Sequence, residues 1–197
     1  MSKRIRILAA VLSGCFVLSL CCCIAYKMGA GSAKRIAVNF ETSDRHAEEP
    51  HKYQFLDKPV SDYICSLSAE LGIDSNLVVA ILMVENPEFN ADAVHRNENG
   101  TIDCGLFQLN DRYIWTAFKD SYWFENLDLD PFNWKHSAYL AMHHIAYLQT
   151  KLKVTDEVVM AYNCGTAAVM SDRIPDITRA YLRKVNTNLF LLNERTQ

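Results

Sequence analysis

The stretch LVVAILMVENPEFNADAVHRNENGTIDCGLFQLN, residues 77–110, decides the fold and carries the candidate chemistry. Residues 77–84 are apolar around the whole girth of a helix, and a helix of that kind belongs in a core. Pro87 predicts that this helix ends near Glu85. Burial disfavours the charged form of a carboxyl group, so the pKa of Glu85 is expected to be raised. Glu85 is therefore a candidate general acid, which can donate a proton to a leaving oxygen.

The rest of the pattern predicts an all-α domain with at most one small hairpin. Asn, Asp and Gly recur between residues 90 and 100, and Asn99-Gly100 is a strong turn signal in a loop that can carry a hairpin. Helical spacing of apolar residues recurs on both sides of this loop. The expected helices cover residues 62–71, 77–85, 109–118, 132–152, 155–162 and 175–185, with a last turn at 189–192.

The first 26 residues form a separate segment. Three basic residues precede the apolar run 7–26, and a helix of that length rises about 30 Å, which matches a bilayer core. This favours an uncleaved signal anchor in the cell membrane, with one span and an extracytoplasmic domain. Two alternatives stay open: a lipoprotein signal, in which Cys15 follows Leu12-Ser13-Gly14, and a secretory signal cleaved near residue 25 or residues 30–33.

Residues 27–55 are expected to be a flexible tether. They contain Gly29, Gly31 and a charged stretch with Pro50, and no helical or strand period persists there. The expected division is therefore a membrane segment at 1–26, a tether at 27–55 and a domain at 56–197.

The composition limits the classes of partner and cofactor. The formal net charge is −3, and no clustered basic face points to nucleic acid. His136, His143 and His144 do not form a plausible ligand set, because adjacent histidines on a helix point about 100° apart. Neither a metal nor a cofactor is expected.

Several short motifs, of which the first begins with Glu85, occur in the order in which a known family carries them. They are Glu85-Asn86-Pro87-Glu88-Phe89, Gly105-Leu106-Phe107-Gln108, Ala138-Tyr139-Leu140 after Asp130-Pro131, Ala161-Tyr162-Asn163-Cys164-Gly165 and Tyr181-Leu182-Arg183-Lys184-Val185. Together they resemble the lytic transglycosylase SLT domain of the lysozyme-like superfamily over roughly residues 58–186. The longer stretch 97–103 before Gly105 resembles the small transglycosylases that accompany conjugation and secretion machineries, so such an apparatus is an expected partner.

The resemblance implies cleavage of the MurNAc–GlcNAc β-1,4 bond in peptidoglycan strands, with formation of 1,6-anhydro-muramic ends. It implies that Glu85 acts first as acid and then as base, and that Tyr162 orients Glu85. The residues that it assigns to substrate binding are Asn86, Gly105, Phe107, Gln108, Asn110, Asn163 and Tyr181.

Asp103 leaves a second mechanism open. The stretch also resembles animal-type lysozymes, in which an acidic residue stands just before the Gly-x-x-Gln run. A retaining hydrolase needs two carboxyl groups about 5 Å apart, so one alternative is a hydrolytic muramidase that uses Glu85 and Asp103. The simpler interpretation of Asp103 is a turn-forming aspartate beside Gly105. A third alternative is a peptidoglycan-binding assembly module that kept the fold and lost the chemistry.

Cysteine and aromatic residues near these motifs allow two interpretations each. Cys104 and Cys164 lie in active-site motifs and are expected either to form a disulfide or to pack as apolar thiols. Among the aromatic residues, sugar stacking competes with core packing for Tyr113, Trp115, Trp123 and Trp134.

Overall fold

The structure is a computed structural model that describes residues 51–116 and 128–194. The expected membrane segment 1–26 and most of the expected tether lie outside the described residues. Within the described part of the chain, no helix combines the length and the apolar character that crossing a bilayer requires.

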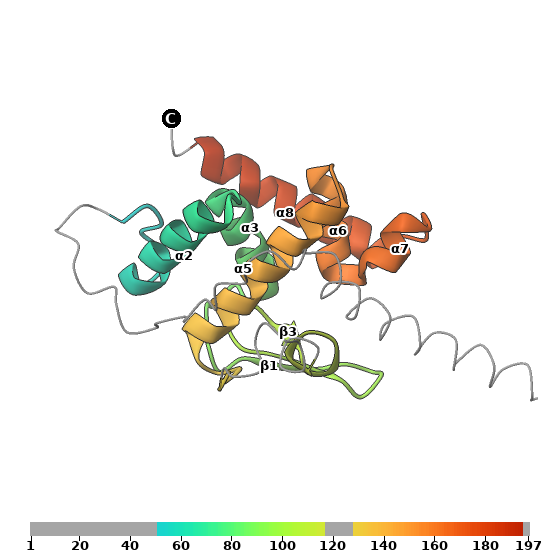
Figure 1. The fold of residues 1–197 in the computed structure, drawn as a ribbon, viewed down its shortest axis with the longest axis horizontal. Coiled ribbons are helices and arrows are strands. Elements are labelled where there is room, and N and C mark those ends of the chain that lie inside the picture. Colours follow the sequence, from blue (N-terminus) through green and yellow to red (C-terminus); the bar gives the residue numbers. More distant parts are fainter. Residues whose placement is uncertain (1–50, 117–127, 195–197) are drawn as a thin grey trace, which may run out of the picture.

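The domain is mostly helical with one small sheet, as the sequence predicts (Figure 1). The helices before the sheet are α2 (Lys58–Leu71) and α3 (Ser75–Glu85). The strands are β1 (Val94–Arg96), β2 (Ile102–Cys104) and β3 (Leu109–Asn110), followed by the π-helix η1 (Asp111–Trp115). The helices that follow are α5 (Trp134–Lys151), α6 (Thr155–Cys164), α7 (Thr166–Met170) and α8 (Asp176–Glu194).

Helix α3 is the core element that carries Glu85. Asp74 caps its first turn by accepting a hydrogen bond from the Asn76 amide, and residues 76–82 are all buried. The helix packs against α2 and along α8, and α8 in turn packs against α6. Because α3 is apolar all round, these neighbours enclose it and bring α8 to the end of the helix at Glu85.

The sheet lies below the helices in Figure 1 and is antiparallel, in the order β1-β2-β3. Its register pairs His95 with Asp103 in one ladder and Asp103 with Asn110 in the other. The hairpin expected from Asn99-Gly100 is thus confirmed, with a third strand added.

The helix expected at residues 109–118 is only partly right. Residues 109–110 form β3, and the π-helix starts at Asp111. The reason is local, because the Asn110 side chain accepts hydrogen bonds from the amides of Arg112 and Tyr113 and so caps a helix that starts two residues later than expected. Residues 117–118 of the expected helix lie outside the described residues.

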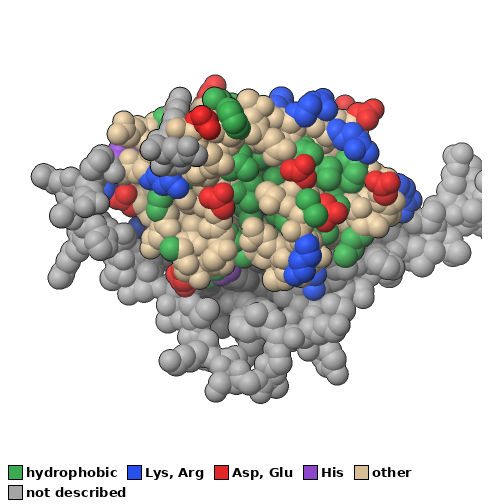
Figure 2. Space-filling view, turned by 90° about the horizontal axis from the view of Figure 1, so that it is seen from above, with side chains coloured by type: hydrophobic (Ala, Val, Ile, Leu, Met, Phe, Trp, Pro, Cys, Tyr) green, Lys and Arg blue, Asp and Glu red, His purple; other side chains and the backbone are tan. Residues whose placement is uncertain are grey.

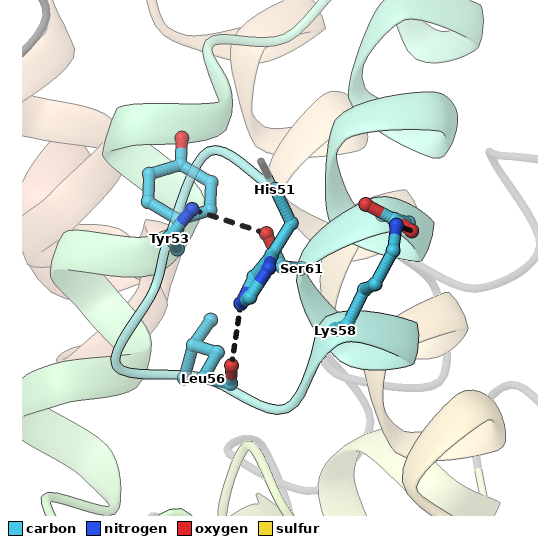
Figure 3. A network of polar contacts seen from close by, with 6 residues as sticks. His51, Tyr53, Leu56, Lys58 and Ser61 are labelled. Atoms are coloured by element: carbon cyan, nitrogen blue, oxygen red, sulfur yellow. Dashed lines mark hydrogen bonds and ion pairs between the residues drawn. The ribbon is translucent and has the colours of Figure 1, made fainter. Parts of the chain in front are cut away.

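The domain also starts earlier than residue 56. Tyr53 is only 2% exposed, and its hydroxyl lies 2.8 Å from both Ser75 Oγ and Asn76 Oδ1. The backbone amide of Tyr53 donates to Ser61 Oγ, and His51 Nε2 lies 3.1 Å from the Leu56 carbonyl oxygen (Figure 3). Residues 51–55, which we expected in the tether, therefore pack as part of the domain.

Candidate active site

Glu85 is the last residue of α3, and its carboxyl group is held by α8. The Tyr181 hydroxyl donates a 2.6 Å hydrogen bond to Glu85 Oε1. Burial raises the pKa of Glu85 to about 7, although the hydrogen bond from Tyr181 opposes this rise and the charge of Asp103 adds to it. Near neutral pH this carboxyl group therefore exists in both protonated and ionised forms, which suits a group that gives and takes a proton.

The tyrosine that contacts Glu85 is not the one that the motifs assigned to it. Tyr162 lies on α6 and donates to the Phe107 carbonyl oxygen at 3.3 Å. Its pKa is raised well above the usual value by burial and by the charges of Glu85 and Asp103, so Tyr162 still faces the same site. The orienting hydrogen bond comes from Tyr181, because α8 and not α6 packs along α3.

Asn86 fixes the backbone on both sides of the site. Its side-chain amide donates to the carbonyl oxygens of Asn90 at 2.7 Å and Leu106 at 3.1 Å. Its Oδ1 accepts from the Asn90 amide, and the residue is only 4% exposed. The amide thus ties the end of α3 to the loop that carries Gly105 and Gln108. Direct contact between Asn86 and substrate stays a prediction.

Gly105 passes very close to the segment that precedes α5. Its φ is +78°, and a Cβ at this position would lie 2.1 Å from the Pro131 carbonyl oxygen. Only glycine fits both the positive φ and the close approach. Gly105 therefore shapes the loop, and its contact with substrate stays a prediction.

Phe107 and Gln108 differ in what they present to the site. The Phe107 side chain is fully buried, so it cannot stack on a sugar ring, and its backbone amide donates to Ser137 Oγ. Gln108 has a φ of +47°, and its Nε2 donates to the carbonyl oxygens of Ala93 and Gly105. The side-chain amide oxygen of Gln108 is therefore the atom that can accept a hydrogen bond from a ligand.

Asp103 belongs to the central strand of the sheet, so the interpretation as a turn residue is wrong. Its Oδ1 accepts from Asn110 Nδ2 at 2.6 Å and its Oδ2 from Asn97 Nδ2 at 2.8 Å. The charge of Asp103 raises the pKa of both Glu85 and Tyr162. The second carboxylate is therefore rigidly held and acts on the same site. Asn110, which we expected to bind substrate, donates to this carboxylate and also caps the start of η1.

A family model of the transglycosylase SLT domain matches residues 62–176. The chain belongs to the transglycosylase SLT domain family. The match spans more than half of the 197 residues and includes Glu85, the Gly105–Gln108 turn and Tyr162, whereas Tyr181 lies beyond it. A search of curated proteins found no match to the chain. Membership supports lytic transglycosylase activity, with peptidoglycan as the substrate.

The SLT domain contains other predicted residues in roles that do not involve a reacting atom. Asn163 accepts a 2.7 Å hydrogen bond from Thr178 Oγ1, which joins α6 to α8. Cys104 and Cys164 are free thiols, so the disulfide alternative is wrong. The Cys104 thiol instead points to the Leu109 carbonyl oxygen and the Cys164 thiol to its neighbour Gly165.

The aromatic residues of the SLT domain divide between core and surface. Trp115 is buried, and Trp134 packs edge-on against Tyr63 at 5.7 Å, so core packing is confirmed for these two. Tyr113 is 53% exposed, so sugar stacking stays a prediction for this residue. Trp123 lies outside the described residues.

No sequence pattern marks the residues that hold this site in place from the second layer of contacts. Asn97 holds Asp103 and Ser137 holds the Phe107 amide, yet each stands in an ordinary loop or helix pattern. His144 packs 5.7 Å from the Tyr162 ring, and burial lowers its pKa to about 4. Within the described residues, no group of three or more His, Cys, Asp or Glu side chains is arranged to hold a metal ion.

Proposed function

We propose that this chain cleaves the MurNAc–GlcNAc β-1,4 bond of peptidoglycan by lytic transglycosylation and leaves 1,6-anhydro-muramic ends. The observation that carries the proposal is the Glu85 carboxyl group, which has a pKa of about 7 and accepts a hydrogen bond from Tyr181. One group that is easily protonated and easily ionised near neutral pH suits a reaction in which the same residue acts as acid and as base.

The steps follow from the two states of Glu85. The protonated carboxyl group donates its proton to the glycosidic oxygen, and the bond from that oxygen to C1 of the muramic acid breaks, which releases the GlcNAc end as an alcohol. The carboxylate then takes the proton of the 6-hydroxyl of the same muramic acid. The 6-oxygen bonds to C1 and closes the anhydro ring, so no water is consumed and Glu85 is protonated again.

Tyr181 positions Glu85 through both steps. Its hydroxyl favours the ionised form of the carboxyl group and so counteracts part of the rise in pKa that burial causes. This keeps the pKa of Glu85 near 7 rather than higher, where the base step would fail because the proton would not leave.

A hydrolytic muramidase is the second candidate, and Asp103 is the observation that favours it. Two amide donors fix both carboxylate oxygens of Asp103, and its charge reaches Glu85. In that mechanism Asp103 supports or attacks the C1 cation and a water molecule completes the cleavage. The chemistry of the new chain ends separates the two candidates.

The rate of cleavage is expected to depend on pH through Glu85. Because the first step needs the protonated acid, kcat/KM should be level at acidic pH and fall above about pH 7. Tyr181→Phe removes a group that favours ionisation, so the fall should move to higher pH. Asp103→Asn removes a repelling charge, so the fall should move to lower pH. Release of soluble fragments measured from pH 4 to 9 checks both shifts.

The exposed Tyr113 supplies the control for these profiles. Tyr113→Phe removes the same hydroxyl as Tyr181→Phe at an exposed residue of η1, and the midpoint of the profile should stay in place. Shifts of the same sign in Tyr181→Phe and Asp103→Asn would contradict the assigned electrostatics.

We further propose that residues 7–26 anchor the chain in the cell membrane with the domain on the extracytoplasmic side, where peptidoglycan lies. The apolar run and the basic residues before it support this. A lipid on Cys15 or cleavage of the segment would give the same placement. The resemblance of residues 97–103 to transglycosylases of secretion and conjugation systems supports local opening of the wall for such an apparatus.

Digestion of purified peptidoglycan by the full chain tests this function. We expect soluble muropeptides that end in 1,6-anhydro-muramic acid, identified by mass spectrometry. Reducing muramic ends would instead favour the hydrolase. Binding to peptidoglycan without any release of fragments would support the assembly module that has lost its chemistry.

A further inference from the structure

A short segment before α2, residues 51–56, contacts both the start of helix α3 and the loop that follows its end. We call this segment the strap. Near its start, the Tyr53 hydroxyl bonds with two side chains in the first turn of α3. Further along the strap, the Phe55 ring packs against Phe89, with ring centroids 5.8 Å apart and planes tilted by 35°. The strap therefore reaches the loop that joins the catalytic helix to the sheet.

The strap is held in place by contacts of its own. Tyr53 and Leu56 are buried, the Tyr53 amide donates to Ser61 Oγ on α2, and His51 Nε2 lies 3.1 Å from the Leu56 carbonyl oxygen (Figure 3). Phe55 stands between these two buried residues in the chain. Its ring is therefore presented to the loop after α3 by a well-fixed piece of backbone.

Phe89 adopts a backbone conformation that needs support from its surroundings. Its φ is +54°, a value that a bulky side chain rarely adopts. A strained conformation of this kind persists only where neighbouring contacts hold it. The Phe89 amide donates to the Asn86 carbonyl oxygen at 3.0 Å, and the ring packs against the core as well as against Phe55. The contact with Phe55 therefore helps to offset the cost of the left-handed backbone.

The kink at Phe89 acts on the residue that directly follows Glu85. Where the chain turns at Phe89, Asn90 faces Asn86. The Asn86 side chain donates to the Asn90 carbonyl oxygen at 2.7 Å and accepts from the Asn90 amide at 3.2 Å. The same side chain donates to the Leu106 carbonyl oxygen. Because Asn86 is joined by a peptide bond to Glu85, fixing Asn86 limits the directions in which the Glu85 carboxyl group can point.

Neither exposure nor the family match distinguishes Phe55. The face seen from above carries many hydrophobic side chains among charged ones (Figure 2), and Phe190 is more exposed than Phe55, at 63% against 38%. Phe55 also lies before residue 62, at which the match to the SLT domain begins. What distinguishes Phe55 is the contact of its ring with Phe89, in the loop next to Glu85.

We propose that Phe55 is a positioning residue for glycan cleavage, because its ring holds Phe89 in the left-handed kink and thereby keeps Glu85 aligned with the glycosidic oxygen. This inference rests on the proposed function, because it assigns the cleavage to Glu85. Phe55 acts through Phe89 and Asn86, and not on the substrate itself. The strap, by which the N-terminal part of the chain joins the domain, is thereby coupled to the catalytic loop.

The test replaces Phe55 with Ala in the full chain and measures glycan cleavage together with hydrogen exchange. We expect kcat for the release of soluble fragments to fall by about ten-fold, within the range that a small displacement of a catalytic group can cost, while KM stays unchanged. Exchange at the amides of Phe89 and Asn90 should become about five-fold faster, because an aromatic pair at this spacing contributes up to about a factor of ten to such an equilibrium. Urea denaturation checks that the variant is folded under the assay conditions.

Three further variants make the result specific. Phe55→Tyr keeps the ring and should keep both kcat and the slow exchange. Phe190→Ala removes the same ring at an exposed residue of α8 and should also leave both unchanged. Phe55→Leu keeps apolar bulk without the ring, so it replaces Phe55→Ala in the comparison if that variant does not fold, and a smaller loss of kcat is expected.

The outcomes separate this inference from the proposed function. A wild-type kcat or wild-type exchange in Phe55→Ala, a change in KM alone, or equal losses in Phe55→Tyr and Phe55→Ala would overturn the positioning role while the cleavage by Glu85 stands. A wild-type chain that releases no fragments would overturn the proposed function, and the inference with it.

Discussion

Replacing Glu85 with Gln is expected to lower the rate of glycan cleavage by about 10³-fold, the middle of the range for a lost general acid and base. Gln is nearly isosteric with Glu and can still accept the hydrogen bond from Tyr181, but it can neither donate the proton to the leaving oxygen nor remove one from the 6-hydroxyl. No other carboxyl group takes over, because Asp103 already has both oxygens fixed by Asn97 and Asn110.

Release of soluble muropeptides from labelled peptidoglycan measures this loss. Glu88→Gln is the matched control, since Glu88 is exposed and lies three residues away, and its activity should equal that of the wild type. A Glu85→Gln enzyme with more than about a tenth of the wild-type rate would remove Glu85 from its role, because general acid–base catalysis accounts for at least about 10²-fold.

The stability of this variant separates lost chemistry from lost folding. The folded-state pKa of Glu85 is about 7, above the value of about 4.3 for an unfolded chain. The folded state therefore holds the proton more tightly, and its stability falls as the pH rises from about 4.3 to about 7. Above pH 7 the wild type contains a buried charge that Glu85→Gln lacks, so the variant should be at least as stable there as the wild type.

Replacing Gly105 with Ala is expected to destabilise the domain by about 3 kcal/mol or more, the size of effect seen when backbone strain and a steric clash coincide. The added Cβ would lie 2.1 Å from the Pro131 carbonyl oxygen and 3.1 Å from Ser137 Oγ. The first of these contacts is with backbone, which cannot rotate away. The loop must therefore move. Gln108 moves with it, and the hydrogen bond from the Tyr162 hydroxyl to the Phe107 carbonyl oxygen is disturbed.

Gly100→Ala is the matched control for this prediction. Gly100 has the same φ of +78° but nothing within 4 Å of its hypothetical Cβ, so this variant should lose only about 1 kcal/mol from the left-handed backbone. Urea denaturation of the two variants gives the free energy of unfolding for each. Equal losses in the two variants would mean that the contact with Pro131 does not constrain the loop.

Local pattern predicted much of this domain, and the reasons are physical. Helix α3 is apolar on all of its faces, which implied that it is buried. Burial in turn implied a raised pKa for Glu85, and that pKa is about 7. The Asn99-Gly100 turn signal implied the hairpin that β1 and β2 form. In these cases the residue and its cause lie within one element or one turn.

Contacts between distant elements could not be predicted in the same way. The hydrogen bond from Tyr181 to Glu85 joins residues 96 positions apart, and no periodicity tells which of two motif tyrosines reaches the end of α3. The amides that hold Asp103 come from Asn97 and Asn110 on either side of the strand, so no local pattern distinguishes this aspartate from a turn residue. The two thiols lie in separate motifs, and their sulfur atoms point to different backbone oxygens.

The fate of water in the reaction tests the central claim most directly. Peptidoglycan is digested by the full chain in water enriched in ¹⁸O, and the new muramic ends are examined by mass spectrometry. Intramolecular attack by the 6-hydroxyl predicts anhydro ends that lack the mass of one water and contain no ¹⁸O. Reducing ends that carry one ¹⁸O would show that water attacked C1, and would transfer the chemistry from Glu85 alone to the pair of Glu85 and Asp103.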